Sequence, residues 1–136
     1  MQEIELDGGC LCGSLRYSVC GQWIDAGYCH CRICQRSSGS PLVAWLTVPI
    51  NAFRWTFGTA AYYQSSPLGK REFCNRCGTP ILFSRIDKPA TVDITIASLD
   101  HPETVAPQYH IWTASRIPWL ADAHQLPCHA EAGPDD

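Results

Sequence analysis

The stretch Cys29-His30-Cys31-Arg32-Ile33-Cys34 places three thiols within six residues. In an extended segment, alternate side chains leave the same face, so this spacing puts Cys29 beside Cys31. A turn after Cys31 then brings Cys34 to join them. Thiolates suit a soft to borderline divalent ion such as zinc, whereas calcium and magnesium prefer oxygen ligands. The stretch therefore predicts a zinc site with three sulfur ligands, and the tetrahedral preference of zinc leaves one position open.

Two further cysteine pairs flank this stretch along the chain. Cys74 and Cys77, followed by Gly78, have the spacing of a zinc knuckle, in which a glycine with a positive φ lets backbone amides point at sulfur. Cys10 and Cys12 lie between glycines, where the backbone can wrap around a metal. We expect these four cysteines to share a structural zinc that joins the start of the fold to its middle.

If those four cysteines act together, Cys29, Cys31 and Cys34 remain as the protein ligands of a second zinc. Three ligands are typical of a catalytic zinc that keeps a position for water or substrate. The alternative is a structural site closed by a fourth ligand, for which His30, His110 and Cys20 are the candidates. The ring of His30 should point away from its two cysteine neighbours, which favours a role behind the ligands or at the surface.

The remaining cysteines, Cys20 and Cys128, have no partner at metal spacing, so we expect them to be small buried side chains. Nine cysteines is an odd number, and seven of them form clusters that are poor disulfide pairs but good chelating sets. Zinc binding is therefore favoured over a disulfide framework.

Length and charge narrow the class of protein. A chain of 136 residues is typical of one domain, which we place at residues 1–130, followed by a loose tail at 131–136. The formal charge of −3 and the pI near 5.9 disfavour nucleic acid and membrane surfaces as partners. No signal peptide or membrane span is evident, which predicts a cytoplasmic protein. The sequence predicts no oligomeric state.

The rest of the sequence predicts mainly β structure, because alternation and short β-rich runs outnumber helical periods. In the segment 91–99 the residues Val92, Ile94 and Ile96 should face the core, with Asp93 and Thr95 toward solvent. The predicted strands cover 13–19, 42–48, 51–57, 60–64, 70–73, 80–86, 91–99 and 109–113.

Four segments together resemble the glutathione-dependent formaldehyde-activating enzyme family, whose domain is shared with centromere protein V. They are Gly8-Gly9-Cys10-Leu11-Cys12-Gly13, Cys29 to Cys34, Phe73-Cys74-Asn75-Arg76-Cys77-Gly78, and His110-Ile111 with Pro118-Trp119. The resemblance implies a β-tent of twisted antiparallel sheets with zinc-ribbon-like cysteine knuckles. It also implies a structural zinc on Cys10, Cys12, Cys74 and Cys77 and a catalytic zinc on Cys29, Cys31 and Cys34.

The same resemblance implies a carbon-sulfur lyase-type activity, in which glutathione and formaldehyde, or another thiol and small aldehyde, condense to S-hydroxymethylglutathione or its analogue. The alternative function is a non-catalytic zinc-binding domain for a protein or peptide. Glutathione carries carboxylates, so cations that flank the cysteines are candidate contacts, and aromatic residues are candidates for the walls of a pocket. The cations are Arg32, Arg36, Lys70, Arg71 and Arg76, and the aromatic residues are Trp45, Trp55, Trp112 and Trp119.

Overall fold

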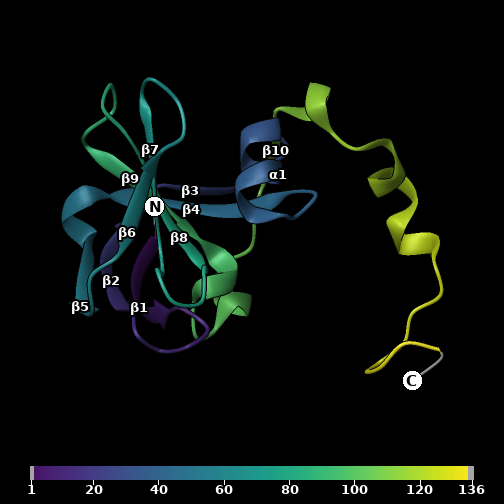
Figure 1. Cartoon of the computed structure of the whole chain (residues 1–136), viewed down its shortest axis with the longest axis horizontal. Helices are drawn as coiled ribbons and strands as arrows, with labels where there is room; N and C mark the ends of the chain where they lie inside the picture. The colour runs from purple at the N-terminus through teal and green to yellow at the C-terminus, as the bar shows by residue number, and fades with distance from the viewer. Residues whose placement is uncertain (1, 135–136) are drawn as a thin grey trace.

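Two β-sheets share one apolar core in the computed structural model, which describes residues 2–134 (Figure 1). The smaller sheet has the strand order β1-β2-β5, and both of its pairings are antiparallel. Its strands are β1 (Gln2–Gly9), β2 (Arg16–Trp23) and β5 (Phe53–Phe57). The loop between β1 and β2 carries Cys10 and Cys12.

The larger sheet has the order β10-β3-β4-β9-β8-β7-β6 and is antiparallel except where β10 runs parallel to β3. The turn between β7 and β8 carries Cys74 and Cys77. The strands of this sheet are β3 (Asp25–Cys29), β4 (Val43–Pro49), β6 (Ala61–Gln64), β7 (Gly69–Phe73), β8 (Pro80–Arg85), β9 (Thr91–Thr95) and β10 (His110–Ile111).

Helices are short and connect the strands. The α-helix α1 spans Arg32–Ser38, and the 3-10 helices span Ile50–Ala52, Ile96–Ser98, Pro102–Thr104, Thr113–Ser115 and Pro118–Gln125. Within residues 2–134, no helix is long and apolar enough to cross a membrane. Figure 1 shows the C-terminal segment, in yellow, running away from the sheets, and every residue from Ala121 to Pro134 is exposed. Residues 135 and 136 of the predicted tail lie outside the described part of the chain.

The predicted mainly β fold, a β-tent of sheets with two cysteine knuckles, is confirmed. The sequence patterns did not predict β1, β3 or the helix α1. The predicted strand from Thr91 ends too late, because Ile96–Ser98 forms a 3-10 helix. The helix α1 was missed because its seven residues are too few to show an apolar period.

The core includes the side chains that the alternation in 91–99 predicted to be internal. Tyr17 and Val19 on β2 are buried, as are Val92, Ile94 and Ile96. The prediction that Asp93 and Thr95 face solvent is wrong. Thr95 is buried and donates to the carbonyl of Pro80 at 2.8 Å, while Asp93 is half-buried. Both side chains are held by neighbouring strands, because Thr95 donates to Pro80 on β8 and Asp93 accepts from Thr47 on β4.

Candidate metal centres

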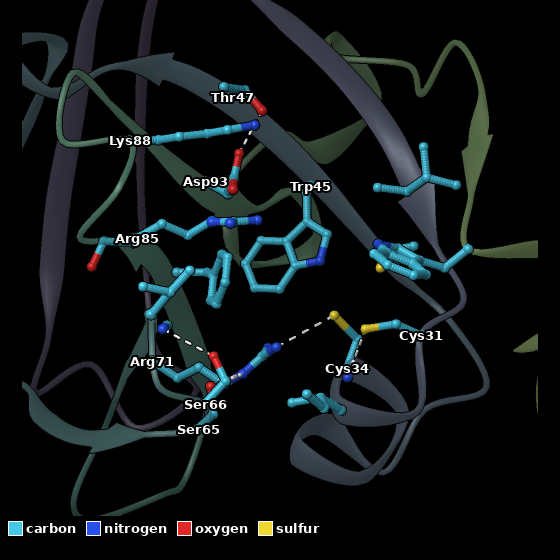
Figure 2. Close-up of a pocket in the computed structure, with 18 of the residues that line it drawn as sticks. Cys31, Cys34, Trp45, Thr47, Ser65, Ser66, Arg71, Arg85, Lys88 and Asp93 are labelled. Carbon is cyan, nitrogen blue, oxygen red and sulfur yellow. Dashed lines mark hydrogen bonds between the residues drawn. The ribbon is translucent and has the colours of Figure 1, made fainter.

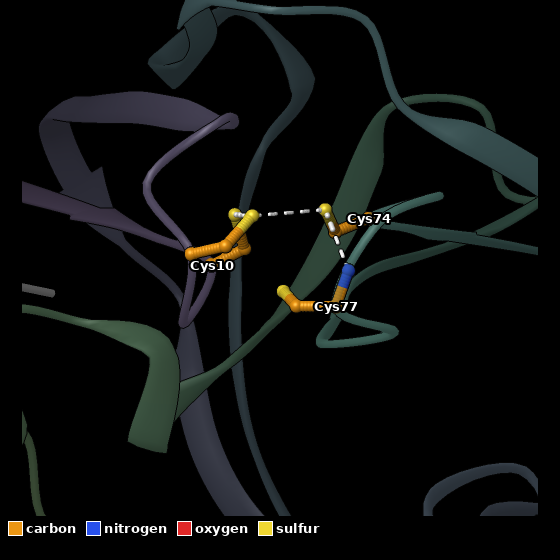
Figure 3. Close-up of side chains that lie close together, drawn as sticks. Cys10, Cys74 and Cys77 are labelled. Atoms are coloured by element: carbon orange, nitrogen blue, oxygen red, sulfur yellow. Dashed lines mark hydrogen bonds between the residues drawn. The ribbon is translucent and has the colours of Figure 1, made fainter.

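Four sulfur atoms come together where the loop after β1 meets the turn after β7 (Figure 3). The ligand atoms of Cys10, Cys12, Cys74 and Cys77 all lie within 4.8 Å of one another. The Sγ atom of Cys12 is 3.7 Å from that of Cys10 and 3.7 Å from that of Cys74. A zinc ion bound tetrahedrally at 2.3 Å would separate its sulfur ligands by roughly 3.8 Å. The cluster therefore fits zinc in donor type and in spacing.

Backbone donors surround this four-sulfur cluster. Leu15 donates its amide to Cys10 Sγ at 3.2 Å, and the amides of Arg76 and Cys77 point at Cys74 Sγ at 3.3 and 3.4 Å. Gly78 has a φ of 81°, which confirms the positive φ predicted for the knuckle. The amide of Cys77 is the main cause that lowers the pKa of Cys74 to about 7. These donors stabilise thiolates, the form in which cysteine binds a metal.

Three further sulfur atoms come together at the start of α1. Cys29 ends β3, Cys31 is the N-cap of α1, and Cys34 lies in its first turn, with their sulfurs within 4.8 Å of one another. The extended backbone of Cys31, with φ −65° and ψ 149°, lets its Sγ accept the amide of Cys34 at 3.3 Å. The turn predicted to bring Cys34 round is thus the first turn of a helix.

Charge is unevenly shared within this three-sulfur cluster. A hydrogen bond between Cys29 and Cys34 raises the pKa of Cys29 and lowers that of Cys34 to about 5. The Arg71 guanidinium also lowers the pKa of Cys34, because its Nη2 donates to Cys34 Sγ at 3.6 Å. The cluster has a thiolate stabilised by a neighbouring cation.

None of the candidate fourth ligands joins the three-sulfur cluster within the described chain. His30 is buried, and its Nε2 is 2.8 Å from Nδ1 of His110, so the two histidines bind each other. This excludes the surface role considered for His30. Cys20 is exposed on β2, and Cys128 is exposed near the C-terminus. The prediction that these two cysteines are buried is therefore wrong.

A cavity of about 770 Å³ opens beside the three-sulfur cluster, and Cys29, Cys31 and Cys34 all line it (Figure 2). No cysteine of the four-sulfur cluster does. Arg71 enters this cavity from β7, where Ser65 Oγ accepts from its Nε at 3.0 Å. The guanidinium lies 4.7 Å from the ring centroid of Phe83 and 6.0 Å from that of Trp45. These contacts hold the charge of Arg71 next to the sulfurs.

The cavity contains some of the predicted contact residues but not all of them. Arg32, Arg71, Trp45 and Trp112 line it, whereas the candidates that do not are Arg36, Lys70, Arg76, Trp55 and Trp119. Four charged residues of the lining were not predicted from the sequence, namely Asp25, Asp93, Arg85 and Lys88. The one signal in the sequence for this charged lining was Asp93, a carboxylate within an apolar strand pattern. The alternation by itself placed Asp93 toward solvent and did not indicate a cavity.

Comparisons with known proteins identify a family model and a solved structure that match most of the chain. The sequence profile described as glutathione-dependent formaldehyde-activating enzyme matches residues 5–115. A crystal structure of a Rhodobacter sphaeroides protein, solved as a structural-genomics target, superposes with a TM-score of 0.63 at 23% sequence identity. The match covers 77% of this chain and 99% of that chain, and it shows a shared fold. No curated protein matches the sequence significantly.

Proposed function

Because the chain belongs to the glutathione-dependent formaldehyde-activating enzyme family, we propose that it condenses a thiol such as glutathione with formaldehyde or another small aldehyde. In this reaction the thiol sulfur forms a bond to the carbonyl carbon. The S–H bond and the carbonyl π bond break, and the carbonyl oxygen takes up the proton that the thiol loses to become a hydroxyl group. The reverse reaction is that of a carbon-sulfur lyase.

Two zinc sites serve this function. Cys10, Cys12, Cys74 and Cys77 would hold a structural ion, and Cys29, Cys31 and Cys34 would hold the ion at which the thiol reacts. When bound to three protein ligands, zinc supplies an open position that lowers the pKa of a substrate thiol. The observation that carries the proposal is the cavity, which exposes the three-sulfur cluster to a ligand and leaves the four-sulfur cluster outside.

Arg71 balances charge at the reacting end of the cavity. A divalent ion held by three thiolates would carry a net charge of about −1, and a substrate bound as a thiolate would add further negative charge. The Arg71 guanidinium, which donates to Cys34 Sγ, offsets part of that charge. Arg71 therefore favours the entry of an anionic sulfur.

Positioning must supply most of the acceleration. A free thiol of pKa about 8.5 is roughly 3% ionised at pH 7, so complete ionisation offers at most about 30-fold. A thiolate of low pKa is also less nucleophilic. The walls formed by Trp45 and Phe83, half-buried beside Arg71, confine the thiol and the aldehyde next to the cysteines. Confinement of two reactants is the larger effect.

The test combines metal analysis with the spectroscopy of the bound metal. We expect two zinc ions per chain, and we expect glutathione to add a sulfur ligand to one of them at the X-ray absorption edge. NMR exchange spectroscopy with labelled formaldehyde should then show that formaldehyde and its glutathione adduct interconvert faster with the protein than without it. Cys34→Ser should abolish both effects, whereas Cys20→Ser, which changes an exposed cysteine outside both clusters, should abolish neither. Two zincs that ignore glutathione would favour the non-catalytic binding domain instead.

A further inference from the structure

The chain beyond Ser115 forms an arm that leaves the body of the protein. Figure 1 shows this C-terminal arm, residues 116–134, running away from both sheets on the side of β10 and α1. Its 3-10 helix, Pro118–Gln125, has eight residues, whereas runs longer than about four residues are uncommon for such helices. Trp119 and Leu126 are each 63% exposed. The arm therefore presents large apolar side chains that its own chain leaves mostly uncovered.

The root of the arm is fixed to the body. Gln35 is buried on α1, and its Nε2 donates to the carbonyl of His30 at 2.8 Å and to the carbonyl of Ser115 at 3.1 Å. Ser115 comes four residues after β10, the strand at one edge of the seven-stranded sheet. These hydrogen bonds hold the start of the arm at that edge of the sheet.

A second apolar surface lies toward the opposite edge of the same sheet. A cavity of about 410 Å³, which we call the β6–β8 groove, is lined by residues of β6, β7 and β8 and of the segment after β8. Its large apolar side chains are those of Ile50, Tyr62, Leu68 and Ile86, and Tyr62 and Ile86 are each 70% exposed. Contiguous exposed apolar side chains of this kind mark interaction sites.

The charges of the arm and of the groove are opposite. Residues 117–136 contain four of the 13 acidic residues and none of the 10 Lys and Arg residues, so they carry −4 and residues 1–116 carry +1. The groove is lined by Lys70 and Arg85 and by no carboxylate of the described chain. Arg85 is bonded to Asp87, but Lys70 takes part in no ion pair between described residues. Opposite charges favour the encounter of the two surfaces.

The groove is out of reach of Trp119 in the same chain. Five strand spacings, roughly 24 Å, separate β10 from β7 in the sheet. The backbone of Trp119 is at most about 14 Å from that of Ser115, because each extended residue spans about 3.5 Å. The arm also runs away from β6 and β7 (Figure 1). A second copy of the chain brings a groove within reach, and a reciprocal exchange around a twofold axis fills both grooves.

We propose that two copies of this chain form a dimer by exchanging their C-terminal arms. Trp119 and Leu126 of each arm enter the β6–β8 groove of the other copy, where the acidic arm lies near Lys70 of the partner subunit. The length of the arm is close to the roughly 20 residues that each side of a stable interface contributes. The inference is independent of the proposed function, because none of these residues belongs to either cysteine cluster.

Analytical ultracentrifugation of the zinc-loaded full chain measures the assembly. We expect a dimer at about 10 μM protein. Trp119→Ser in the arm and Ile86→Ser in the groove should each raise the Kd of the dimer by about 30-fold or more, as the loss of an interface anchor does. Phe57→Ser, at an exposed position on β5 outside both surfaces, is the matched control and should leave the Kd unchanged. A monomer at every concentration, an open series of species larger than a dimer, or a dimer that Trp119→Ser and Ile86→Ser leave intact would overturn the proposal.

A mixture of the two variants separates arm exchange from a loss of folding. Trp119→Ser keeps an intact groove, and Ile86→Ser keeps an intact arm, so one of the two contacts can form in a mixed pair. We therefore expect the mixed pair to associate more tightly than either variant associates with itself. If the equimolar mixture associates no better than the separate variants, the arm does not enter the groove.

The charge of the groove has its own test. Lys70→Glu places a negative charge where the acidic arm should lie, so we expect the Kd of the dimer to rise by about 10-fold. Arg54→Glu, which reverses an exposed cation on β5 outside the groove, is the control and should change the Kd little. If the two variants dimerise equally well, the acidic arm does not lie in this groove, and the proposal is overturned.

Discussion

The two cysteine clusters offer the same ligand type in opposite surroundings. The four-sulfur cluster joins segments about 60 residues apart in sequence, from Cys12 to Cys74, and none of its cysteines lines the cavity of about 770 Å³. The three-sulfur cluster lies within six residues, from Cys29 to Cys34, and opens on about 770 Å³ beside a cation. The contrast teaches that ligand count and surroundings, more than ligand type, separate a site that holds the fold from one that can bind a substrate.

The largest expected effect is the loss of the long-range cluster. Cys74→Ser removes a buried ligand that ties the loop after β1 to the turn after β7, so we expect the free energy of unfolding to fall by about 4 kcal/mol or more. Thermal unfolding with parallel zinc analysis measures this. Cys20→Ser, at an exposed position outside the clusters, should change the midpoint by only a few degrees. If Cys74→Ser keeps two zinc ions and an unchanged thermal unfolding midpoint, the four-sulfur cluster does not stabilise the fold, and the two clusters do not differ in this respect.

A cysteine-to-serine substitution in the three-sulfur cluster should lower the reaction rate more than the stability. Cys31→Ser keeps an oxygen that can cap α1 through the amide of Cys34, so the helix is preserved while a sulfur ligand is lost. We expect zinc content to fall from two ions to one and the free energy of unfolding to fall by about 1 kcal/mol. Thiol addition to formaldehyde, followed by NMR exchange, should slow by about 100-fold or to the uncatalysed rate. A Cys31→Ser protein that unfolds like Cys74→Ser would show that both clusters are structural.

Alkaline pH should destabilise the core around the four-sulfur cluster through the buried hydroxyl of Tyr17. The Tyr17 hydroxyl is buried, is 2.7 Å from Ser98 Oγ, and belongs to the same core cluster as Cys10 and Cys74. Burial raises its pKa to about 12, whereas an unfolded tyrosine loses its proton near pH 10. The unfolded state therefore binds fewer protons between about pH 10 and 12, so the stability present below pH 10 is lost through that window, by about 2 kcal/mol.

Denaturant unfolding of paired variants at pH 9 and above pH 11 measures that loss. Tyr17→Phe should lower the stability by about 1 kcal/mol at pH 9, because the hydrogen bond to Ser98 is removed, but should reduce the further loss at high pH. Tyr63→Phe, at an exposed position on β6, is the control and should keep the alkaline loss. If Tyr17→Phe loses as much stability at high pH as the unmodified chain, another group is responsible.

The cysteine clusters could be predicted from sequence because their information is local. The knuckle at Cys74 and Cys77 needs only a short turn and Gly78, and the three-sulfur cluster lies within six residues. Even the pairing of Cys10 and Cys12 with the distant knuckle follows, because two pairs complete a four-ligand set. The β class follows equally from local alternation, as Val92 and Ile94 show.

The charged lining of the cavity could not be predicted, because no local pattern places its residues together. Asp25 lies on β3, a strand with no apolar alternation, and reaches Asp93 only through the register of both strands with Thr47 on β4. A strand pattern assigns side chains to a face, but it does not say whether that face is solvent or a cavity. Asp93 was therefore placed toward solvent, although the sheet brings it into the cavity.

The smallest effect concerns the cation that distinguishes the two clusters. Arg71→Gln should leave both zincs and the fold in place, because Arg71 is not a ligand, but should weaken glutathione about 10-fold at the second metal. Arg71→Lys keeps the charge but loses the fork that reaches both Ser65 and Cys34, so partial recovery should follow. Titration of the cobalt-substituted protein, read from its sulfur charge-transfer band, separates these cases. If the Arg71→Gln and Arg71→Lys variants bind glutathione equally, the charge of Arg71 does not contribute to binding. The cavity beside the three-sulfur cluster would then be the feature that distinguishes it from the four-sulfur cluster.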